Sequence, residues 1–290
     1  MLVLTVRTVN SLNETSLMNW ECFAQGCDAG RLTVRMVNIH AVGSGEGAMA
    51  LADIHGDGPR PGRLRAAGRS QDILATFTRF VAERGYSEAN FSDIAGELGI
   101  SKGTIVHHYG TKDRLFAAMH DSYMRRCLGD ATHIVASLHG SAEQLAGLLY
   151  SFILYQVSDR DATVAFQREI ATLATHPAME GGRRLRAEYL GLVRQVIETG
   201  VAEGVFRSSD VEVDSLLMFG SSQWAWTWFR PAGRLSALEV GSQLVQLVLG
   251  GLLRNRRQLA ALADPAGRAA RTAEDRLSRS ARAPGSEHVA

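Results

Sequence analysis

The stretch NFSDIAGELGISKGTIVHHY, residues 90–109, decides the fold of this chain. It predicts two short helices joined by a tight turn, with Ser101 placed to cap the second helix. Gly99 lies where the first helix must end, because glycine adopts a left-handed backbone without strain. Ala95, Gly99 and Ile105 follow one another at the spacing of a DNA-binding helix-turn-helix. An ordinary helical hairpin is the alternative that this spacing alone leaves open.

Amphipathic segments flank this stretch on both sides. Residues 70–84 carry apolar side chains at helical spacing and end at Gly85, and residues 112–123 do the same after Thr111. Residues 69–123 as a whole resemble the N-terminal domain of TetR-family transcriptional regulators, which favours the helix-turn-helix over the hairpin. The matching pieces are Ile73-Leu74, Gly85-Tyr86, Ile94-Ala95, Leu98-Gly99, Ser101 to Ile105, His108-Tyr109 and Lys112 to Leu115.

The resemblance implies an all-α protein with two domains. An N-terminal three-helix helix-turn-helix DNA-binding domain would cover residues 67–123, and a C-terminal helical ligand-binding and dimerisation domain would cover residues 124–254. Residues 1–66 lack a coherent hydrophobic pattern, so we predict a poorly ordered N-terminal extension. Residues 255–290 are rich in Ala and Arg and poor in bulky apolar residues, which predicts a disordered basic tail.

The second helix of the motif carries the candidate DNA-binding side chains. Lys102 can reach a guanine edge and Thr104 a base or a thymine methyl group, with His107 as the next candidate for base readout. Val106 stands where the family usually has a tyrosine that touches the DNA backbone, so that contact must be absent or come from His107. The full candidate set is Ser101, Lys102, Thr104, His107, His108, Tyr109, Lys112 and Arg69.

Four members of this set are expected to play other parts. Tyr109 and Lys112 lie just past the helix and suit contacts to phosphate, which position a protein on DNA without reading its sequence. His108 can pack against the first helix instead of facing DNA. Arg69 closes a run of arginines that suits phosphate and minor-groove contacts, although a solvated linker would have the same composition.

The resemblance also implies a ligand cavity enclosed by helices between residues 142 and 230. The segment 224–236 is similar to regulators of fatty-acid, steroid and other acyl-CoA catabolism, which implies a small apolar or acyl-CoA-type effector. Arg168 could hold the phosphates of a coenzyme A group, since guanidinium pairs with phosphate, but an ordinary surface charge is the alternative. The candidate pocket residues are Phe166, Arg168, Tyr189, Trp224 and Trp228.

Two predicted helices, residues 211–229 and 236–254, carry more apolar surface than one helix pair can hide. Two such helices from each of two subunits would form a four-helix bundle with two-fold symmetry, as the reading of two DNA half-sites requires. The alternative is that both helices only complete the core of the single chain. The candidate interface residues are Leu216, Phe219, Gly220, Leu244, Leu247, Val248 and Gly251.

Composition and motifs narrow the function classes further. The 290 residues carry a net charge of +1, which by itself does not indicate nucleic-acid binding. Cys22, Cys27 and Cys127 are too few for a disulfide framework, and no second ligand pair completes a zinc site. Because no nucleophile elbow, glycine-rich phosphate loop or zinc-hydrolase motif is present, we expect neither catalysis nor a bound metal or cofactor. Short apolar runs and the lack of a leader peptide favour a cytoplasmic protein without membrane contact.

The sequence therefore predicts a homodimeric, ligand-responsive transcriptional regulator that binds a double-stranded DNA operator. By the habit of the family it would be a repressor that a small apolar or acyl-CoA-type effector releases. A helical scaffold that binds protein partners through residues 211–254 is the alternative. Specific, salt-sensitive binding to duplex DNA would separate the two hypotheses.

Overall fold

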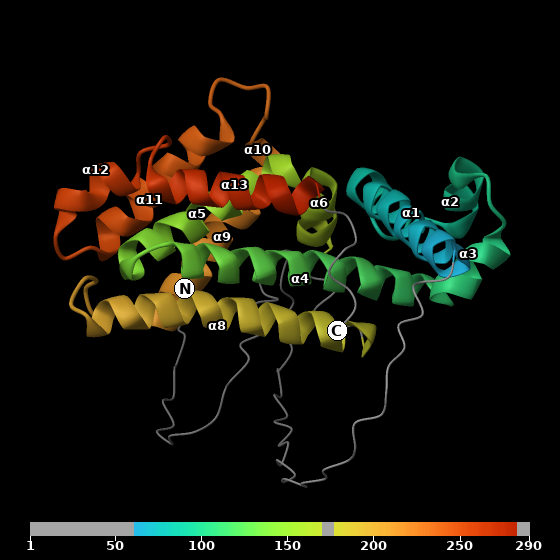
Figure 1. Ribbon diagram of the computed structural model, residues 1–290, viewed down its shortest axis with the longest axis horizontal. Coiled ribbons are helices and arrows are strands. Elements are labelled where there is room, and N and C mark those ends of the chain that lie inside the picture. Colours follow the sequence, from blue (N-terminus) through green and yellow to red (C-terminus); the bar gives the residue numbers. More distant parts are fainter. Residues whose placement is uncertain (1–60, 170–176, 283–290) are drawn as a thin grey trace, which may run out of the picture. The chain divides into compact units, whose positions relative to one another are not determined.

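The computed structural model describes residues 61–169 and 177–282, which form an all-α protein, as predicted (Figure 1). The only extended pairing within these ranges is a bridge between Phe206 and Leu253. The helices are α1 (Pro61–Arg84), α2 (Phe91–Leu98), α3 (Lys102–Tyr109), α4 (Lys112–Ser137), α5 (Gly140–Ser158), α6 (Arg160–Arg168), η2 (Pro177–Met179), α8 (Glu180–Ala202), α9 (Val211–Gln223), α10 (Ala225–Trp228), α11 (Ala237–Leu252), η3 (Arg256–Gln258), α12 (Leu259–Leu262) and α13 (Arg268–Arg282).

The predicted N-terminal extension, residues 1–66, lies outside the described residues as far as residue 60, and so do Cys22 and Cys27. Residues 61–66 belong to α1, which therefore begins earlier than predicted. Cys127 is a buried free thiol. None of the described helices combines the length and the apolar character needed to cross a membrane.

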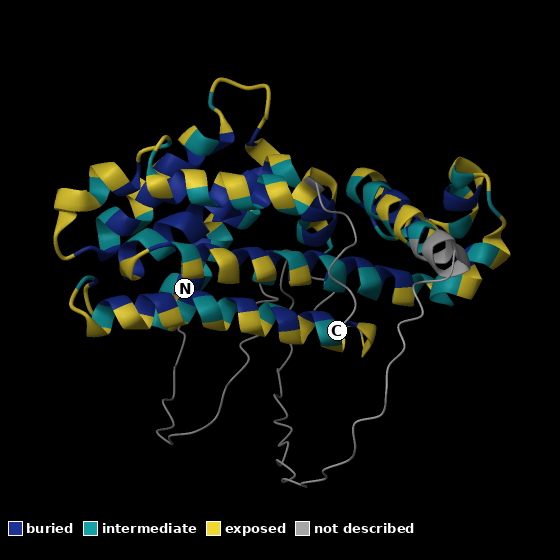
Figure 2. Cartoon of the chain, in the orientation of Figure 1, coloured by how far each residue is buried: buried dark blue, intermediate teal, exposed yellow. Residues whose placement is uncertain are grey.

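The buried residues, dark blue in Figure 2, form two hydrophobic cores. The first lies between α1, α2, α3 and the start of α4, and Ile73, Phe77 and Ile105 at its centre are completely buried. The second lies between the rest of α4 and the helices that follow, with Leu148 and Val193 among its completely buried members. Each of the two predicted domains thus has a core of its own.

Helix α4 belongs to both cores. Leu115 and Met119 near its start pack in the first core, whereas Tyr123 and Ile134 pack in the second. The predicted boundary between residues 123 and 124 therefore falls inside a continuous helix of 26 residues, where the packing partners change but the backbone does not. We call the helices around the first core the first unit and those around the second core the second unit. One continuous helix, and not a linker, joins them.

The predicted disordered tail is wrong for residues 256–282, which form η3, α12 and α13. One face of α13 carries Ala269, Ala270, Ala273 and Leu277 at helical spacing, and all four are buried. Small side chains let a helix approach its neighbours closely, and Ala and Arg are both strong helix formers. The segment lacks bulky residues, and its buried face consists mainly of small side chains, so its composition alone resembles that of a disordered tail. Residues 283–290 lie outside the described part of the chain.

Helix α5 is enclosed on all sides, with every residue from 145 to 156 buried. It packs against α8, α11 and α13. The approach of α11 is close enough to require glycine, since a Cβ atom on Gly241 would lie 2.6 Å from Cδ1 of Tyr150. Helix α5 is thus the centre of the second unit.

Candidate nucleic-acid interface and effector core

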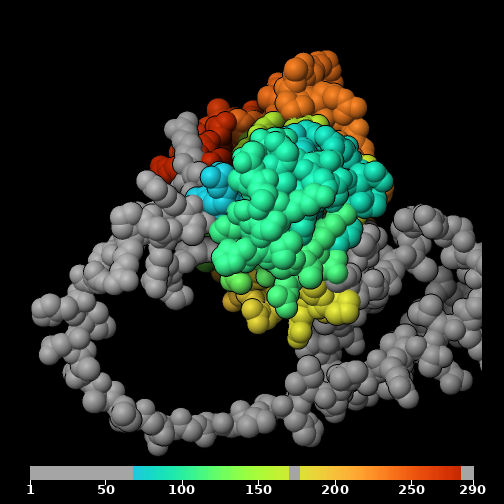
Figure 3. Space-filling model, turned by 90° about the vertical axis from the view of Figure 1, so that its right-hand side faces the viewer, coloured from blue at the N-terminus to red at the C-terminus, as the bar shows by residue number. Residues whose placement is uncertain are grey.

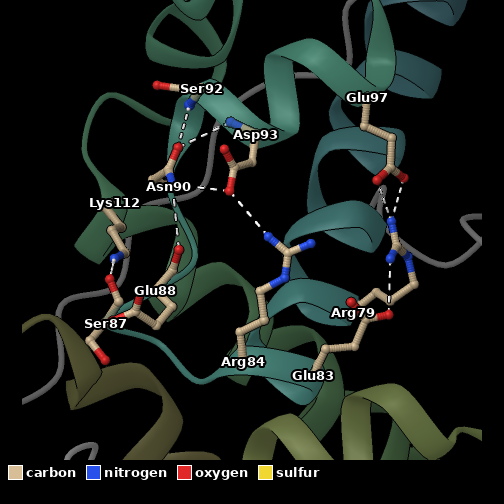
Figure 4. Close-up of polar contacts among 10 residues, drawn as sticks. All are labelled: Arg79, Glu83, Arg84, Ser87, Glu88, Asn90, Ser92, Asp93, Glu97 and Lys112. Carbon is tan, nitrogen blue, oxygen red and sulfur yellow. Dashed lines mark hydrogen bonds and ion pairs between the residues drawn. The ribbon is translucent and has the colours of Figure 1, made fainter.

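The start of α2 is fixed by a local cap. The side-chain oxygen of Asn90 accepts hydrogen bonds from the backbone N–H groups of Ser92 (2.9 Å) and Asp93 (3.0 Å), which a helix end leaves unpaired otherwise. Asp93 accepts from the side-chain amide of Asn90 at 3.1 Å and from Arg84 at 3.2 Å (Figure 4). Asp93 therefore fixes both the cap and the end of α1.

The turn between α2 and α3 has the predicted geometry. Gly99 lies in the left-handed region (φ 61°, ψ 36°), and the N–H of Ile100 donates to the Ala95 carbonyl at 3.0 Å. Ser101 then caps α3 by accepting from the N–H of Thr104 at 3.1 Å. Ile105 is completely buried against α2 and the rest of the first core. The helix-turn-helix is confirmed down to its capping groups.

Ion pairs on the surface connect α1 to α2. Arg79 pairs with Glu83 on its own helix at 3.0 Å and with both carboxylate oxygens of Glu97 on α2 (Figure 4). The guanidinium of Arg84 also lies 4.5 Å from the ring centroid of Phe80. These groups are partly exposed, so each pair contributes well under about 1 kcal/mol. They orient α2 on α1 more than they stabilise the fold.

Helix α3 presents one polar face away from the first core. Lys102 and His107 are exposed, Thr104 and His108 are half-buried, and Val106 has half of its surface exposed. Figure 3 views the protein toward this end, where the first unit is drawn in cyan to green. An exposed helix of eight residues with a lysine, hydroxyl groups and imidazoles can enter a DNA major groove and contact base edges.

Tyr109 and Lys112, the predicted phosphate contacts, are held in place by the first unit itself. The Tyr109 hydroxyl donates to the carbonyl of Ser70 and accepts from its hydroxyl, both at 2.8 Å, and burial raises its pKa. The Lys112 ammonium donates to the Ser87 carbonyl at 3.0 Å (Figure 4). It also lies 4.4 Å from the ring centroid of Tyr86. Burial lowers the pKa of Lys112.

An ammonium has three N–H donors, so the hydrogen bond from Lys112 to Ser87 leaves donors for phosphate. Arg69 is exposed on α1, directly before the Ser70 that holds Tyr109. The structure thereby places Arg69, Tyr109 and the end of α3 next to one another. The eight predicted DNA-binding residues lie on or beside α3, and none of them belongs to the second unit.

The predicted pocket residues are not brought together. Phe166 and Tyr189 are buried in the second core, where the Phe166 ring lies 4.8 Å from Tyr123 and the Tyr189 ring 5.5 Å from Phe219. Trp224 and Trp228 are exposed by 62% and 52%, because α9 ends at Gln223 and a separate short helix, α10, follows it. The tryptophans therefore do not line the interior of the chain.

Arg168 is also placed elsewhere. Its guanidinium donates to the carbonyl oxygens of Ala82 (3.2 Å) and Glu83 (3.3 Å), at the end of α1. The expectation that it holds coenzyme A phosphates has no support in this placement, because the side chain is engaged with the first unit. A charged residue at the end of an amphipathic segment gives no signal in the sequence of which helix it will meet.

Two buried polar residues of the second core were missed from the sequence. His120 on α4 is 3% exposed and its ring lies 4.8 Å from that of Phe166. Burial, with a smaller effect of the Arg186 charge, lowers the pKa of His120 to about 4. Gln156 on α5 is completely buried. Within the described residues, Nδ1 of His120 and Oε1 of Gln156 have no hydrogen-bond partner. In the sequence, both residues stand at positions of α4 and α5 where helical periodicity predicts an apolar residue, and this could have indicated them.

The predicted dimer-interface residues differ in how exposed they are in the single chain. Leu247 is 74% exposed and Gly220 has open space where a Cβ atom would stand. Leu244 is instead buried, and Phe219 packs inward with its ring 4.9 Å from that of Phe152. Leu216, Val248 and Gly251 are partly exposed.

Helix α9 and the residue after it carry an exposed apolar stripe that differs from the predicted interface residues except at Gly220. Val213, Leu217, Gly220 and Trp224 follow one another at intervals of four, three and four residues, which places them on one helix face. Leu217 is 66% exposed and Val213 46%. Met218 and Phe219 form a second apolar face, which points inward. The periodicity of apolar residues alone therefore could not show which of the two faces of α9 packs in the core.

Two families match this chain. The one described as "Bacterial regulatory proteins, tetR family" matches residues 73–119, and the one described as "Tetracyclin repressor-like, C-terminal domain" matches residues 139–252. The first range covers most of α1 to the start of α4, including the whole helix-turn-helix. The second covers α5 to α11 and ends before η3, α12 and α13.

Individual proteins are similar over nearly their whole length. The HTH-type transcriptional repressor KstR2 of Mycolicibacterium smegmatis is 27% identical over 188 residues, which are 64% of this chain and 91% of that protein. The structure of the ketosteroid transcriptional regulator KstR2 of Mycobacterium tuberculosis has a TM-score of 0.59 at 26% identity, over 64% of this chain and 96% of that one. AibR, in complex with isovaleryl coenzyme A and operator DNA, shares the fold, with a TM-score of 0.58 at 22% identity over 63% and 99% of the two chains.

Proposed function

This chain belongs to the TetR family of bacterial regulatory proteins, and from that premise we propose that it is a dimeric repressor that a small effector releases from its operator. The chain is a DNA-binding transcriptional regulator, and its relatives are regulators and not enzymes. A protein that acts on the operators of a bacterial chromosome works in the cytoplasm.

The observation that carries the proposal is the division of α3 into two faces. Ile105 holds the helix in the first core with no exposed surface, while Lys102 and His107 stand exposed on the other side. Lys102 and Thr104 read bases, His107 supports them, and Tyr109 with Lys112 contacts phosphate. Because phosphate contacts release counterions, binding weakens steeply with salt for any DNA sequence, and base contacts alone distinguish the operator.

The dimer forms through the exposed stripe of α9 together with α11. Leu217, Trp224 and Leu247 are large apolar side chains in contact with solvent in the single chain, and Gly220 between them lets a partner helix approach closely. Burying such a patch stabilises association by removing apolar surface from water. Leu217→Asp should yield monomers in sedimentation velocity. The control is Val106→Asp, which changes an exposed apolar residue of α3 and should leave the dimer intact.

The effector binds within the second core, beside α6. Phe166 and Tyr123, whose ring centroids lie 4.8 Å apart, supply aromatic surface there, and His120 and Gln156 supply buried polar atoms that no described residue satisfies. The class of effector is an acyl-CoA thioester. This rests on the similarity of residues 224–236 to regulators of acyl-CoA catabolism, and the fold relative AibR was crystallised with isovaleryl coenzyme A. The acyl group would enter the core, because its lining is apolar.

The test is a selection of duplex DNA from a random library with the purified full-length chain, followed by gel shifts. The selected site should bind at low salt, bind more weakly at higher salt, and bind at least 1,000-fold more tightly than scrambled DNA, on the order expected for specific sites. Acyl-CoA thioesters of short, branched, long and steroid-derived acids are then added, with free coenzyme A as the control.

The outcomes separate the parts of the proposal. Release of the DNA by one thioester, and not by coenzyme A, supports the effector class. A specific DNA complex that no thioester releases would support the proposed regulator and overturn the proposed effector class. Failure to enrich any sequence would overturn the regulator and favour a helical scaffold that binds protein partners through α9 and α11.

A further inference from the structure

Helix α13 follows the part of the chain that the family matches cover. The C-terminal family match ends at residue 252, and α13 runs from Arg268 to Arg282. The helix, red in Figure 1, packs along α5 and to a smaller extent along α4. On its inner face Ala270 and Ala273 are completely buried, and Leu277 is 2% exposed. A helix with such a buried face is an integral part of the second unit.

A buried carboxylate joins α13 to α4 and α5. Asp130 on α4 is 1% exposed, and each of its oxygens has a partner on another helix. Nε of Arg276 on α13 donates to Oδ1 at 2.7 Å, and the hydroxyl of Tyr155 on α5 donates to Oδ2 at 3.0 Å. Hydrogen bonds to a charged acceptor in a buried place are stronger than ordinary ones. We call Asp130, Arg276 and Tyr155 the Asp130 network.

The charge of Arg276 keeps Asp130 able to hold Tyr155. Burial raises the pKa of Asp130, whereas the hydrogen bonds from Tyr155 and Arg276 act in the opposite direction. A buried carboxylate that lost its counter-charge would take up a proton more readily. As long as Asp130 is ionised it can only accept, so the proton of the Tyr155 hydroxyl is committed to it. The Tyr155 ring is thereby fixed at its hydroxyl end.

The ring of Tyr155 carries this restraint to the aromatic part of the second core. Its centroid lies 6.1 Å from that of Tyr123, in an edge-to-face arrangement, and the Tyr123 ring lies 4.8 Å from Phe166. Tyr123 and Phe166 are the rings beside which we place the effector. Tyr155 is itself only 6% exposed, so it stands behind these rings as part of the wall of the core.

We propose that Arg276 is a positioning residue of the effector core. Acting through Asp130, it holds the Tyr155 ring against Tyr123, so the helix that follows the family match sets the space left for an acyl group. When this hold is lost, the Tyr155 ring turns and the core admits a larger acyl group. The inference rests on the proposed function, because it assigns a determinant of effector specificity.

Cys127 provides a reporter that needs neither effector nor DNA. It is 4% exposed, and burial raises the pKa of its thiol to about 12, while hydrogen bonding with Tyr123 and Tyr155 acts in the opposite direction. In a full chain with Cys22→Ser and Cys27→Ser it is the only thiol. Its alkylation by iodoacetamide therefore reports how often this part of the core opens. Measuring the rate against denaturant concentration separates local opening from global unfolding, which alone depends steeply on denaturant.

Three variants are compared in this background. Tyr155→Phe removes only the hydroxyl, and the double variant Asp130→Leu, Arg276→Met removes the ion pair without leaving a buried charge. Both should speed alkylation without denaturant about tenfold, as expected for loss of a hydrogen bond to a charged group. Arg268→Met is the matched control, since it removes a partly exposed ion pair of α13 with Glu143 at 3.7 Å and should change the rate less than about twofold. Unchanged rates in both network variants would overturn the inference.

A double-mutant cycle tests whether Arg276 acts through Tyr155. In a Tyr155→Phe background, the added Asp130→Leu and Arg276→Met changes should speed alkylation by less than about twofold, because residues of one network are non-additive. An equal increase in both backgrounds would mean that the ion pair acts on the core by another route, and would overturn the inference.

Effector selectivity is the readout that a merely structural role would not move. Release of the selected DNA is titrated with thioesters of short, branched, long and steroid-derived acids, with free coenzyme A as the control. Both network variants should shift the preference between the best thioester and the next larger one about tenfold toward the larger, on the order of the discrimination that one methylene group gives. An equal loss with every thioester would overturn the inference.

The failure of this inference and that of the proposed function are distinguishable. If no thioester releases the wild type from DNA, the proposed effector class fails. The alkylation rates still decide whether the Asp130 network holds the Tyr155 ring, because they require no effector.

Discussion

The helix-turn-helix and the second unit contrast in how their contacts are specified. In the first unit, Asn90, Gly99 and Ser101 act on groups within about three residues of themselves, and each has the partner that local geometry predicts. In the second unit, the contacts that matter join residues such as Asp130 and Arg276, which are 146 positions apart. A contact between residues close in sequence can be predicted from the local sequence. A contact between distant residues depends on how whole helices pack.

The largest effect in this comparison is expected at Arg276 of α13. Its Nε donates to Oδ1 of Asp130 at 2.7 Å, and Asp130, only 1% exposed, also accepts from the Tyr155 hydroxyl at 3.0 Å. Arg276→Ala should lower the free energy of unfolding by about 3–5 kcal/mol, because it leaves a buried carboxylate without its counter-charge. Chemical denaturation measures this loss. The double variant with Asp130→Asn should recover much of it, and a surface-like loss below about 1 kcal/mol would contradict the assigned burial.

A somewhat smaller effect is expected from the pH dependence that His120 imparts. Its pKa is about 4 in the folded chain against about 6.5 when unfolded, so the unfolded state binds a proton first as the pH falls. Stability is therefore present above pH 6.5 and is lost as the pH falls toward 4, by about 3 kcal/mol from this group. His120→Phe should flatten that part of the stability profile. His133, an exposed histidine of the same helix, is the matched control, and an equal change on replacing it would argue against burial as the cause.

Replacing Lys102 tests whether the exposed face of α3 reads sequence. Lys102→Ala should cost about 1–3 kcal/mol on the selected operator while leaving the stability of the fold and the dimer unchanged. Thr104→Ala should act in the same direction. Affinity measured on scrambled DNA is the control, and an equal loss there would show that Lys102 contacts phosphate and not bases.

The smallest effect is expected at the α2 cap. Asn90→Ala removes two hydrogen bonds to backbone N–H groups and should lower stability by about 1 kcal/mol. Asn90→Asp keeps an acceptor and should cost less. Because the cap is local, neither variant should alter the response to an effector, and a change in that response would mean that the two units are less separable than their cores indicate.

The sequence alone predicted the first unit well because its determinants are short-range. The spacing of Ala95, Gly99 and Ile105 predicts two helices that cross closely after a tight turn. The structure has this arrangement, with Gly99 in the turn and with Ala95 and Ile105 buried. The prediction from the sequence failed for α13. Its buried residues Ala269, Ala270 and Ala273 are small, so none of them alone indicates a core position. The sequence also did not tell that Phe219 packs inward while Leu217 is exposed, since a helix with two apolar faces has no period that shows which face meets its own chain.

What the sequence by itself determined is the class of fold, the helix-turn-helix and the side of α3 that faces outward, because caps, glycines and helical periodicity act over a few residues. Only the tertiary structure decided that Arg168 binds the end of α1 and Glu169 the turn after it, that Arg276 neutralises Asp130, and that His120 and Gln156 are buried. These depend on which helices lie side by side. Burial and charge pairing result from that packing. They cannot be predicted from the residues that neighbour a position along the chain.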